Sequence, residues 1–397
     1  MMKIQVLNNI SNYGLKILED KSFDLIKGEK IEDCDGIVLR SFPLKNIDIP
    51  KSTLAVSRAG AGTNNIDIQK CTDGGVVVFN TPGANANAVK EMVICSLILG
   101  KRDLVSGNKT IDSVDINNLS ESEISKKIED MKKAFVGQEI KGKTLSVIGL
   151  GAIGSMVAEQ AIQLGMNVQG FDPGITVETA LRLPRDIKIK KTIDEAFKKS
   201  DYISLHIPLN ERTKGLINKK LILMANQDSV LINFSRGGIV DERSILEMLD
   251  SNHISKYITD FPTKTLIQRL NQKRDVIIFP HLGASTKESE INCALMACEQ
   301  MALFLETGKI NNSVNFPNIS SPQIGKRRLF ISNENKPGII SKIAEVLADD
   351  GVNILEFVNK SREMVACNLI DSDDEISDDT LLKLSRIKGV SNARLCY

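Results

Sequence analysis

Two side chains in this sequence have the types and positions needed to move a proton and to hold a carboxylate. His281, in FPHLGAST, and Arg236, in NFSRGGIVDE, each follow an apolar run that is typical of a buried strand. A histidine can accept a hydroxyl proton because its ordinary pKa is close to neutral pH. An arginine stays charged and can hold a carboxylate through two parallel hydrogen bonds. With a hydride acceptor nearby, this pair predicts chemistry on a 2-hydroxy acid.

Other interpretations of these residue types are open at this point. His206 also follows a strand-like run, so residue type does not decide which histidine would move the proton. A histidine or arginine after a strand can equally have a structural role, for example in a surface ion pair.

A glycine-rich turn supplies a place for the hydride acceptor. Gly149, Gly151 and Gly154 have the spacing G-x-G-x-x-G, directly after the strand-like run 144–148 and at the start of a helical pattern. This arrangement lets a helix N-terminus and free backbone N–H groups bind a pyrophosphate. Asp172 ends the next strand-like run, where its carboxylate can bond ribose hydroxyls and repel a 2′-phosphate. The sequence therefore predicts a dinucleotide site that prefers NAD to NADP.

Polar loops follow the strand-like runs of the N-terminal region. They are Arg40-Ser41, the segment 57–65 (SRAGAGTNN) and the segment 80–87 (NTPGANAN). In open α/β sheets, ligands bind beyond the carboxyl ends of the strands. These loops are candidates for a second part of the site, although each can also be an ordinary turn.

The elements that must position these residues alternate between strand and helix, which predicts an α/β protein with two doubly wound parallel-sheet lobes. The predicted strands are 3–7, 36–39, 54–57 and 76–79 in the first lobe, and 144–148, 167–171, 202–206, 230–234, 257–260 and 276–279 in the second. Long helices at 86–104 and 285–308 lead from one lobe to the other, with a polar connection at 106–133. The predicted domains are 1–100 with 285–312, and 101–284.

The tail has a different pattern. Residues 313–325, rich in proline and serine, are predicted to be a linker. Residues 326–397 alternate as strand, helix, strand, strand, helix, strand, which predicts a ferredoxin-like βαββαβ unit.

Composition excludes several classes of protein. The chain has 397 residues, a formal net charge of +1 and seven cysteines. No C-x-x-C pair is present, so we expect reduced thiols, no disulfide framework and no metal site. The balanced charge disfavours nucleic acid as a partner, and the longest apolar run is too short to cross a membrane. We therefore expect a cytoplasmic location.

Several segments of the sequence resemble one enzyme family. VLRSFP, SRAGAGTNNIDI, TLSVIGLGAIG, ISLHIPLN, NFSRGGIVDE and FPHLGAST resemble the D-isomer-specific 2-hydroxyacid dehydrogenases. The tail, LFISNENKPGIISKIAEVLADDGVN to ARLCY, is similar to the regulatory ACT domain carried by members that oxidise 3-phosphoglycerate. The resemblance implies a Rossmann NAD domain, a flavodoxin-like substrate domain and a C-terminal ACT domain.

The resemblance also implies residue roles. Arg236 would bind the substrate carboxylate, and His281 would be the catalytic acid and base. The cofactor would lie against Gly149, Gly151, Ala152, Ile153, Gly154, Asp172, His206, Pro208, Thr213, Phe234, Ser235, Asp260, Gly283 and Ala284. The substrate would lie against Arg40, Ser41, Arg58 and Asn85. Of these, Arg40 and Arg58 favour a phosphorylated substrate.

The implied activity is NAD-dependent oxidation of 3-phosphoglycerate to 3-phosphohydroxypyruvate, at the start of L-serine synthesis, by a homodimer or homotetramer. L-Serine is the expected effector, with Asn333, Asn335 and Asn353 as candidate ligands. Two alternatives are another NAD-dependent D-2-hydroxyacid dehydrogenase and a protein that senses NAD without turnover. One NADH absorbance assay with 3-phosphoglycerate separates turnover from sensing.

One position departs from the family pattern. The family usually has a glutamate that pairs with the catalytic histidine, whereas DFPTKTLIQRLNQKRD has Lys264 nearest that position. A glutamate would raise the pKa of His281, and a nearby lysine would lower it. Lys264 therefore either assists an anionic substrate, as a candidate site residue, or points to solvent.

Overall fold

The computed structural model describes residues 1–115, 117 and 119–396. It divides into two compact units, Met1–Asn85 with Thr286–Tyr397, and Ala86–Ser285. Ile116 and Asn118, in the predicted polar connection, and Tyr397, the last residue of the predicted tail, lie outside the described residues. In the described part of the chain, no helix is both long and apolar enough to cross a membrane.

The first unit contains a five-stranded parallel sheet in the order β2-β1-β3-β4-β5, as in flavodoxin-like folds. Its strands are β1 (Lys3–Val6), β2 (Asp24–Lys27), β3 (Gly36–Leu39), β4 (Ala55–Arg58) and β5 (Val77–Phe79). Its short helices are α1 (Asn12–Asp20), η1 (Leu44–Asn46) and α2 (Ile68–Asp73). Strand β2 was not predicted, because DLIK is short and only half-buried and so lacks a clear apolar pattern.

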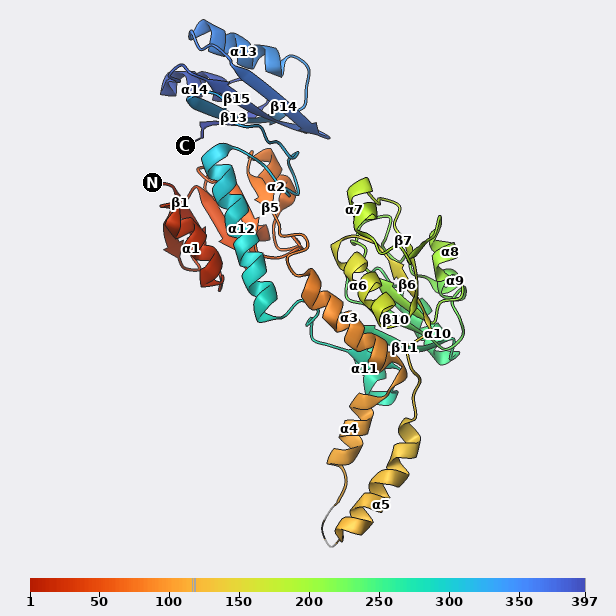
Figure 1. Cartoon of the computed structure of the whole chain (residues 1–397). Helices are drawn as coiled ribbons and strands as arrows, with labels where there is room; N and C mark the ends of the chain where they lie inside the picture. The colour runs from red at the N-terminus through yellow and green to blue at the C-terminus, as the bar shows by residue number, and fades with distance from the viewer. Residues whose placement is uncertain (116, 118, 397) are drawn as a thin grey trace. The chain divides into compact units, whose positions relative to one another are not determined.

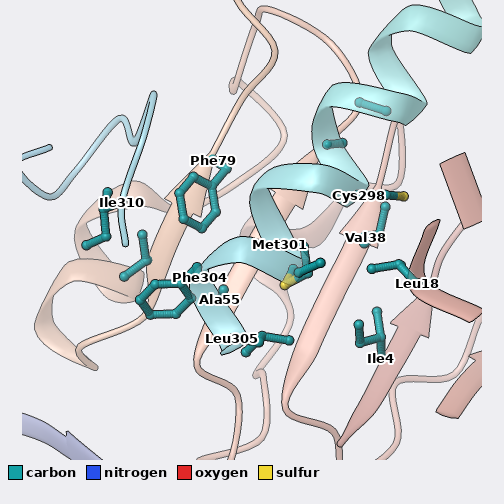
Figure 2. Close-up of a cluster of buried hydrophobic side chains, with 14 of the residues drawn as sticks. Ile4, Leu18, Val38, Ala55, Phe79, Cys298, Met301, Phe304, Leu305 and Ile310 are labelled. Atoms are coloured by element: carbon teal, nitrogen blue, oxygen red, sulfur yellow. The ribbon is translucent and has the colours of Figure 1, made fainter. Parts of the chain in front are cut away.

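Helix α12 (Lys287–Thr307) covers this sheet. It begins where Thr286 Oγ1 accepts a hydrogen bond from Ser289 N, and it ends at Gly308, which has a left-handed conformation. Figure 2 shows its side chains, among them Met301 and Phe304, beside those of β1, β3 and β4. The predicted long helix at 285–308 is confirmed to within two residues.

The second unit contains a seven-stranded parallel sheet in the order β12-β11-β10-β9-β6-β7-β8. Its strands are β6 (Thr144–Ile148), β7 (Asn167–Phe171), β8 (Lys188–Ile189), β9 (Tyr202–Leu205), β10 (Ser229–Asn233), β11 (Ile254–Thr259) and β12 (Val276–Ile278). Its helices include α6 (Ala152–Gln163), α7 (Val177–Arg182), α8 (Ile193–Phe197), α9 (Lys219–Ile222), α10 (Glu242–Asp250) and α11 (Lys264–Gln272). All six predicted strands are present, whereas α7, β8 and α11 were not predicted.

Helix α3 (Ala86–Lys101) also belongs to the second unit. It packs against α6, β10 and β11, and a Cβ on its Gly100 would lie 2.8 Å from Val230 Cγ1. The predicted domain boundary at residue 100 instead places residues 86–100 in the first lobe. Helical periodicity shows that a segment has an apolar face but does not show which sheet covers it.

The predicted polar connection contains two helices, α4 (Leu104–Asp112) and α5 (Glu121–Lys132), which extend from the second unit as an arm (Figure 1). Helix α5 begins with a capping box between Ser120 and Glu123. It is followed by η2 (Lys133–Phe135).

The tail forms the predicted βαββαβ unit, with a four-stranded antiparallel sheet in the order β14-β15-β13-β16. Its elements are β13 (Arg327–Glu334), α13 (Ile339–Asp349), β14 (Glu356–Arg362), β15 (Val365–Ser372), α14 (Asp378–Ser385) and β16 (Val390–Leu395). One face of the sheet packs against α13 and α14. The other contributes Phe330, Cys367 and Leu369 to the core under α12.

The predicted linker at 313–325 is held along its length. Asn315 Oδ1 accepts a hydrogen bond from Val78 N of β5. Ser321 O and Oγ accept bonds from Arg328, whose guanidinium also forms a fully buried ion pair with Asp371. Hydrogen bonds therefore anchor this segment to its neighbours. Its proline and serine content does not indicate this.

Candidate active site

The chemistry-bearing residues of the second unit follow six neighbouring strands at the same end of its sheet. In spatial order they are His281 after β12, Asp260 after β11, Phe234–Arg236 after β10, His206 after β9, Gly149 after β6 and Asp172 after β7. Parallel strands bring their carboxyl ends to one edge of the sheet, so residues far apart in sequence meet there. The strand order reverses between β9 and β6, which is where doubly wound sheets bind dinucleotides.

The glycine-rich turn leaves room for a ligand at one position only. A Cβ at Gly149 would lie 2.4 Å from His206 O, and a Cβ at Gly154 would lie 1.9 Å from Gly149 O. A Cβ at Gly151, in contrast, would have no atom within 4 Å. Helix α6 starts directly after Gly151 without a side-chain cap, so N–H groups of its first turn, including those of Ala152 and Ile153, are available to a phosphate.

Asp172 is fixed against this turn. Its Oδ2 accepts a hydrogen bond from Leu150 N and its Oδ1 accepts one from Gly174 N, both at 2.8 Å. Each oxygen keeps a second lone pair, which suits a ribose hydroxyl donor.

The structure separates the two histidines that residue type alone does not distinguish. Burial lowers the pKa of His206 to about 3, and its Nε2 lies 2.8 Å from Ser204 Oγ. His206 is therefore uncharged at neutral pH and is suited to packing. His281 is exposed, with its ring edge-on to Phe261 and a backbone φ of 49°, a value that residues other than glycine rarely adopt. Its exposure leaves the imidazole open to a substrate proton.

Asp260 has one oxygen in use and one free. It is 2% exposed, and its Oδ2 accepts a hydrogen bond from Gly283 N at 2.9 Å. Its Oδ1 is buried without a hydrogen-bond partner among the described residues. Burial raises the pKa of this carboxyl, while the Gly283 N–H and the charges of His281 and Arg236 act in the opposite direction. A buried acceptor without a donor costs free energy and suits an amide N–H of a ligand.

The loop after β10 is held by a residue that the sequence analysis did not single out. Asn233 Nδ2 donates to Arg236 O at 3.0 Å, and its Oδ1 accepts from Ser235 N. Ser235 Oγ donates to Leu205 O. Phe234 is buried behind this loop, whereas the Arg236 side chain is exposed, with Nη1 donating to Ser235 O.

The remaining predicted residues of the second unit lie in three places. Thr213 Oγ1 donates to Pro208 O at 2.6 Å and closes the loop after His206. Ala284, half-buried, follows Gly283. Lys264 is the exposed first residue of α11, and no hydrogen bond or ion pair joins its side chain to another residue in the described structure. No cluster of three or more His, Cys, Asp or Glu able to hold a metal occurs in the described ranges.

The predicted substrate residues lie in the first unit, after β3 and β5 and at the last residue of β4. Arg58 Nε donates to Arg40 O and to Asn65 Oδ1, and Asn65 Nδ2 donates to Arg40 O and Phe42 O. Ser41 N donates to Asn8 Oδ1. Asn85 Oδ1 is buried and has no partner within the described structure. Arg58 therefore supports the backbone of Arg40, and the Arg40 guanidinium forms an ion pair with Glu290.

The predicted effector residues are not equivalent. Asn333 is 3% exposed, with Nδ2 bonded to Glu334 O and Oδ1 bonded to Asn368 Nδ2. Asn335 and Asn353 are exposed and lie at opposite ends of the C-terminal sheet. Asn335 Nδ2 donates to Glu363 O beyond the end of β14, whereas Asn353 N donates to Asp374 Oδ2 near its start.

The sequence is similar to those of several known proteins. Residues 115–283 match the family model described as D-isomer specific 2-hydroxyacid dehydrogenase, NAD binding domain. The chain is 30% identical over 381 residues to D-3-phosphoglycerate dehydrogenase of Escherichia coli, covering 93% of this chain and 88% of that protein. It is 32% identical over 350 residues to the protein of that name in Bacillus subtilis, covering 85% of this chain but only 63% of the relative.

The fold is also similar to that of a solved structure. A crystal structure of 3-phosphoglycerate dehydrogenase of Entamoeba histolytica with NAD+ bound aligns with a TM-score of 0.63 and 30% identity, over 79% of this chain and 98% of that one. Identity at this level over nearly the whole length, together with the matched NAD-binding domain, shows that the chain belongs to the D-isomer specific 2-hydroxyacid dehydrogenase family.

Proposed function

We propose that the protein is an NAD-dependent D-3-phosphoglycerate dehydrogenase, which oxidises 3-phosphoglycerate to 3-phosphohydroxypyruvate in L-serine synthesis. The observation that carries this proposal is the match to the Escherichia coli enzyme of that name over 93% of this chain. The chain spans 63% of the length of the Bacillus subtilis relative, so the activity is proposed on the residues present in this chain.

The residues at the strand ends fit NAD. Gly151 leaves space for the pyrophosphate at the start of α6, and Asp172 offers acceptors for ribose hydroxyls. The buried, unpartnered Oδ1 of Asp260 fits the carboxamide N–H of the nicotinamide. When bound, NAD+ supplies the acceptor for the hydride that leaves C2 of the substrate.

The chain's own residues supply the rest of the oxidation. His281, exposed after β12, takes the proton of the C2 hydroxyl through its imidazole. Arg236 holds the substrate carboxylate and orients the hydroxyl toward that imidazole. Arg40, with Ser41, Arg58 and Asn85, binds the phosphate end of the substrate.

The test is an NADH absorbance assay with 3-phosphoglycerate, D-glycerate and D-lactate as substrates. We expect turnover with 3-phosphoglycerate and a sharp rise in its KM in Arg236→Gln, which keeps a polar side chain but loses the charge. Preference for an unphosphorylated acid would identify another dehydrogenase of this family. NADH binding without turnover of any substrate would identify a sensor.

The two roles considered for Lys264 predict different results for Lys264→Glu. If the side chain lies against His281, the acidic limb of the pH–rate profile moves to higher pH, because the imidazolium gains a partner. If Lys264 contacts the substrate, KM rises. A variant with neither change places the lysine in solvent, as its exposure and lack of a bonded partner in the described structure favour.

For the C-terminal βαββαβ tail we propose an ACT domain, which binds L-serine between the tails of two copies of the chain. Strand β14 is an edge strand, and antiparallel pairing of two β14 strands about a twofold axis would place the start of one beside the end of the other. That pairing would bring Asn353 of one copy toward Asn335 of a second copy. Both amides can bond the carboxylate and the ammonium of an amino acid. Because Asn333 is buried and bonded within the sheet, the proposal rests on the other two.

The tail also contacts helix α12 of the first unit directly. Arg394 of β16 donates to Phe304 O and Leu305 O at the end of α12, and Phe330 packs edge-on against Phe304. A change at the tail would therefore act directly on α12, whose first turn carries the partner of Arg40.

The experiment measures activity against added L-serine for the intact chain, Asn353→Ala and Asn335→Ala, with Asn108→Ala as an exposed control on α4. We expect inhibition of the intact enzyme and the control, and weaker inhibition in the other two. Equal inhibition of all four would remove these residues from the site, and millimolar serine without effect would refute the regulation. Full-length variants are required, because truncation would uncover the core beneath Phe330.

A further inference from the structure

An ion pair occupies the arginine that the proposed function assigns to the substrate phosphate. Arg40 Nη1 lies 2.7 Å from Glu290 Oε1, and the two side chains are 35% and 49% exposed. Arg40 follows β3, and Glu290 lies in the first turn of α12. Both residues belong to the first unit.

The backbones of both partners are fixed by the surrounding structure. The carbonyl oxygen of Arg40 accepts hydrogen bonds from Arg58 and Asn65, which fix its backbone at the end of β3. Glu290 lies on a 21-residue helix whose inner face is buried in the core of the unit. The pair can therefore open only by rotation of the two side chains, and the half-exposed Glu290 has solvent to move into.

An acidic residue in the first turn of a helix also has a simpler explanation, because it interacts favourably with the helix dipole. Glu288 lies in the same turn and satisfies that preference without an ion pair in the described structure. The dipole therefore explains an acidic residue at this turn but does not explain the contact with Arg40.

We propose that Glu290 is a resident competitor for the phosphate position: its carboxylate occupies the Arg40 guanidinium until the phosphate of the substrate replaces it. This rests on the proposed function, in which Arg40 binds that phosphate. A phosphate monoester carries about −1.5 to −2 charges at neutral pH and three acceptor oxygens, so it replaces a single carboxylate on the same guanidinium. The affinity for phosphorylated ligands is thereby lowered by the cost of opening the pair.

The competition predicts a selective effect. Glu290→Gln should lower the KM for 3-phosphoglycerate by about two- to five-fold, the range that corresponds to an exposed ion pair of about 0.4–1 kcal/mol. The KM for D-glycerate should not change, because D-glycerate has no phosphate that needs Arg40. The change should lie in KM and not in kcat, because Glu290 has no part in moving the proton.

The matched control is Glu288→Gln, which removes the same charge from the same turn without opening the pair. The second control is a double-mutant cycle with Arg40→Gln: once Arg40 is removed, Glu290→Gln should have no further effect. A general effect of charge would lower KM equally in both glutamate variants and would survive the loss of Arg40, which would refute the proposal.

Binding of inorganic phosphate to the full-length chain, measured by calorimetry, gives a readout that does not need turnover. Tighter phosphate binding in Glu290→Gln than in wild type, absent in the Arg40→Gln background, supports the competition even if 3-phosphoglycerate is not oxidised. Turnover of 3-phosphoglycerate with unchanged phosphate affinity in Glu290→Gln overturns the competition and leaves the proposed function intact.

Discussion

The carboxyl ends of the two parallel sheets carry different kinds of side chain. In the second unit the end of the sheet combines an open glycine turn, a neutral His206 and a buried Asp260 with one free oxygen, together with the exposed Arg236. In the first unit the corresponding end carries Arg40 and Arg58, each bonded to acceptors of the protein. Close packing dominates around the glycine turn, whereas charged groups dominate around Arg40 and Arg58. Substitutions, pH and salt should therefore affect the two ends differently.

The largest expected effect is at His281, the proposed proton acceptor of the second unit. His281→Asn should lower the rate of 3-phosphoglycerate oxidation by about 10²–10⁴, because the proton acceptor is lost. NADH affinity, measured by fluorescence titration, should be unchanged, because His281 is exposed and makes no side-chain hydrogen bond in the described structure. Equal losses of rate and of NADH affinity would mean that the residue shapes the cofactor site instead.

The next test separates space for a ligand from space for packing within the glycine turn. Gly151→Val should keep the melting temperature and weaken NAD binding by about tenfold or more, because its side chain enters open space that the pyrophosphate needs. Gly154→Val should instead lower stability, by about 1–3 kcal/mol or more, because its Cβ would overlap Gly149 O. Thermal unfolding and NAD titration of both variants make the comparison, and loss of stability in Gly151→Val would contradict it.

The same contrast explains what could be predicted from the sequence. The turn after β6, Asp172 and the βαββαβ tail have local signals in spacing and periodicity, and the structure has each of them. The partners that tune the site have no such signal: Glu290 meets Arg40, and Asn233 bonds Arg236 O, only through tertiary packing. The side on which α3 packs is likewise a property of two surfaces and not of one helix.

A smaller effect is expected from pH on the packing at His206. Its pKa is lowered to about 3 in the folded chain from an ordinary value of 6.5. Below pH 6.5 the unfolded chain binds a proton that the folded chain does not, so stability is lost as pH falls. Between pH 6.5 and 5.5 this loss is about 1 kcal/mol. The difference in unfolding free energy between wild type and His206→Gln should change by that amount, and an unchanged difference would mean that the imidazole takes up its proton over the same pH range in the folded and unfolded chains.

The smallest expected effect concerns salt. The Debye length is about 30 Å at 0.01 M salt and about 8 Å at 0.15 M. Exposed charges that are further apart than this length are largely screened from each other. Raising salt over this range should raise the KM for 3-phosphoglycerate by a few-fold at most, because screening weakens the attraction between Arg40 and the phosphate. The affinity for NAD should change less with salt. Its proposed pyrophosphate contacts are backbone N–H groups at the start of α6, and short hydrogen bonds are screened less than exposed charges.

The Arg40–Glu290 pair gives this last prediction a sharper form. In wild type, salt weakens both the attraction of Arg40 for the phosphate and the attraction of Glu290 that opposes it, so the two changes partly cancel. In Glu290→Gln only the first remains, and KM should rise more steeply with salt than in wild type. Steady-state KM at several salt concentrations for wild type, Glu290→Gln and Glu288→Gln measures the three slopes. A slope in Glu290→Gln no steeper than in Glu288→Gln would show that the pair does not compete with the phosphate, whatever its distance in the structure.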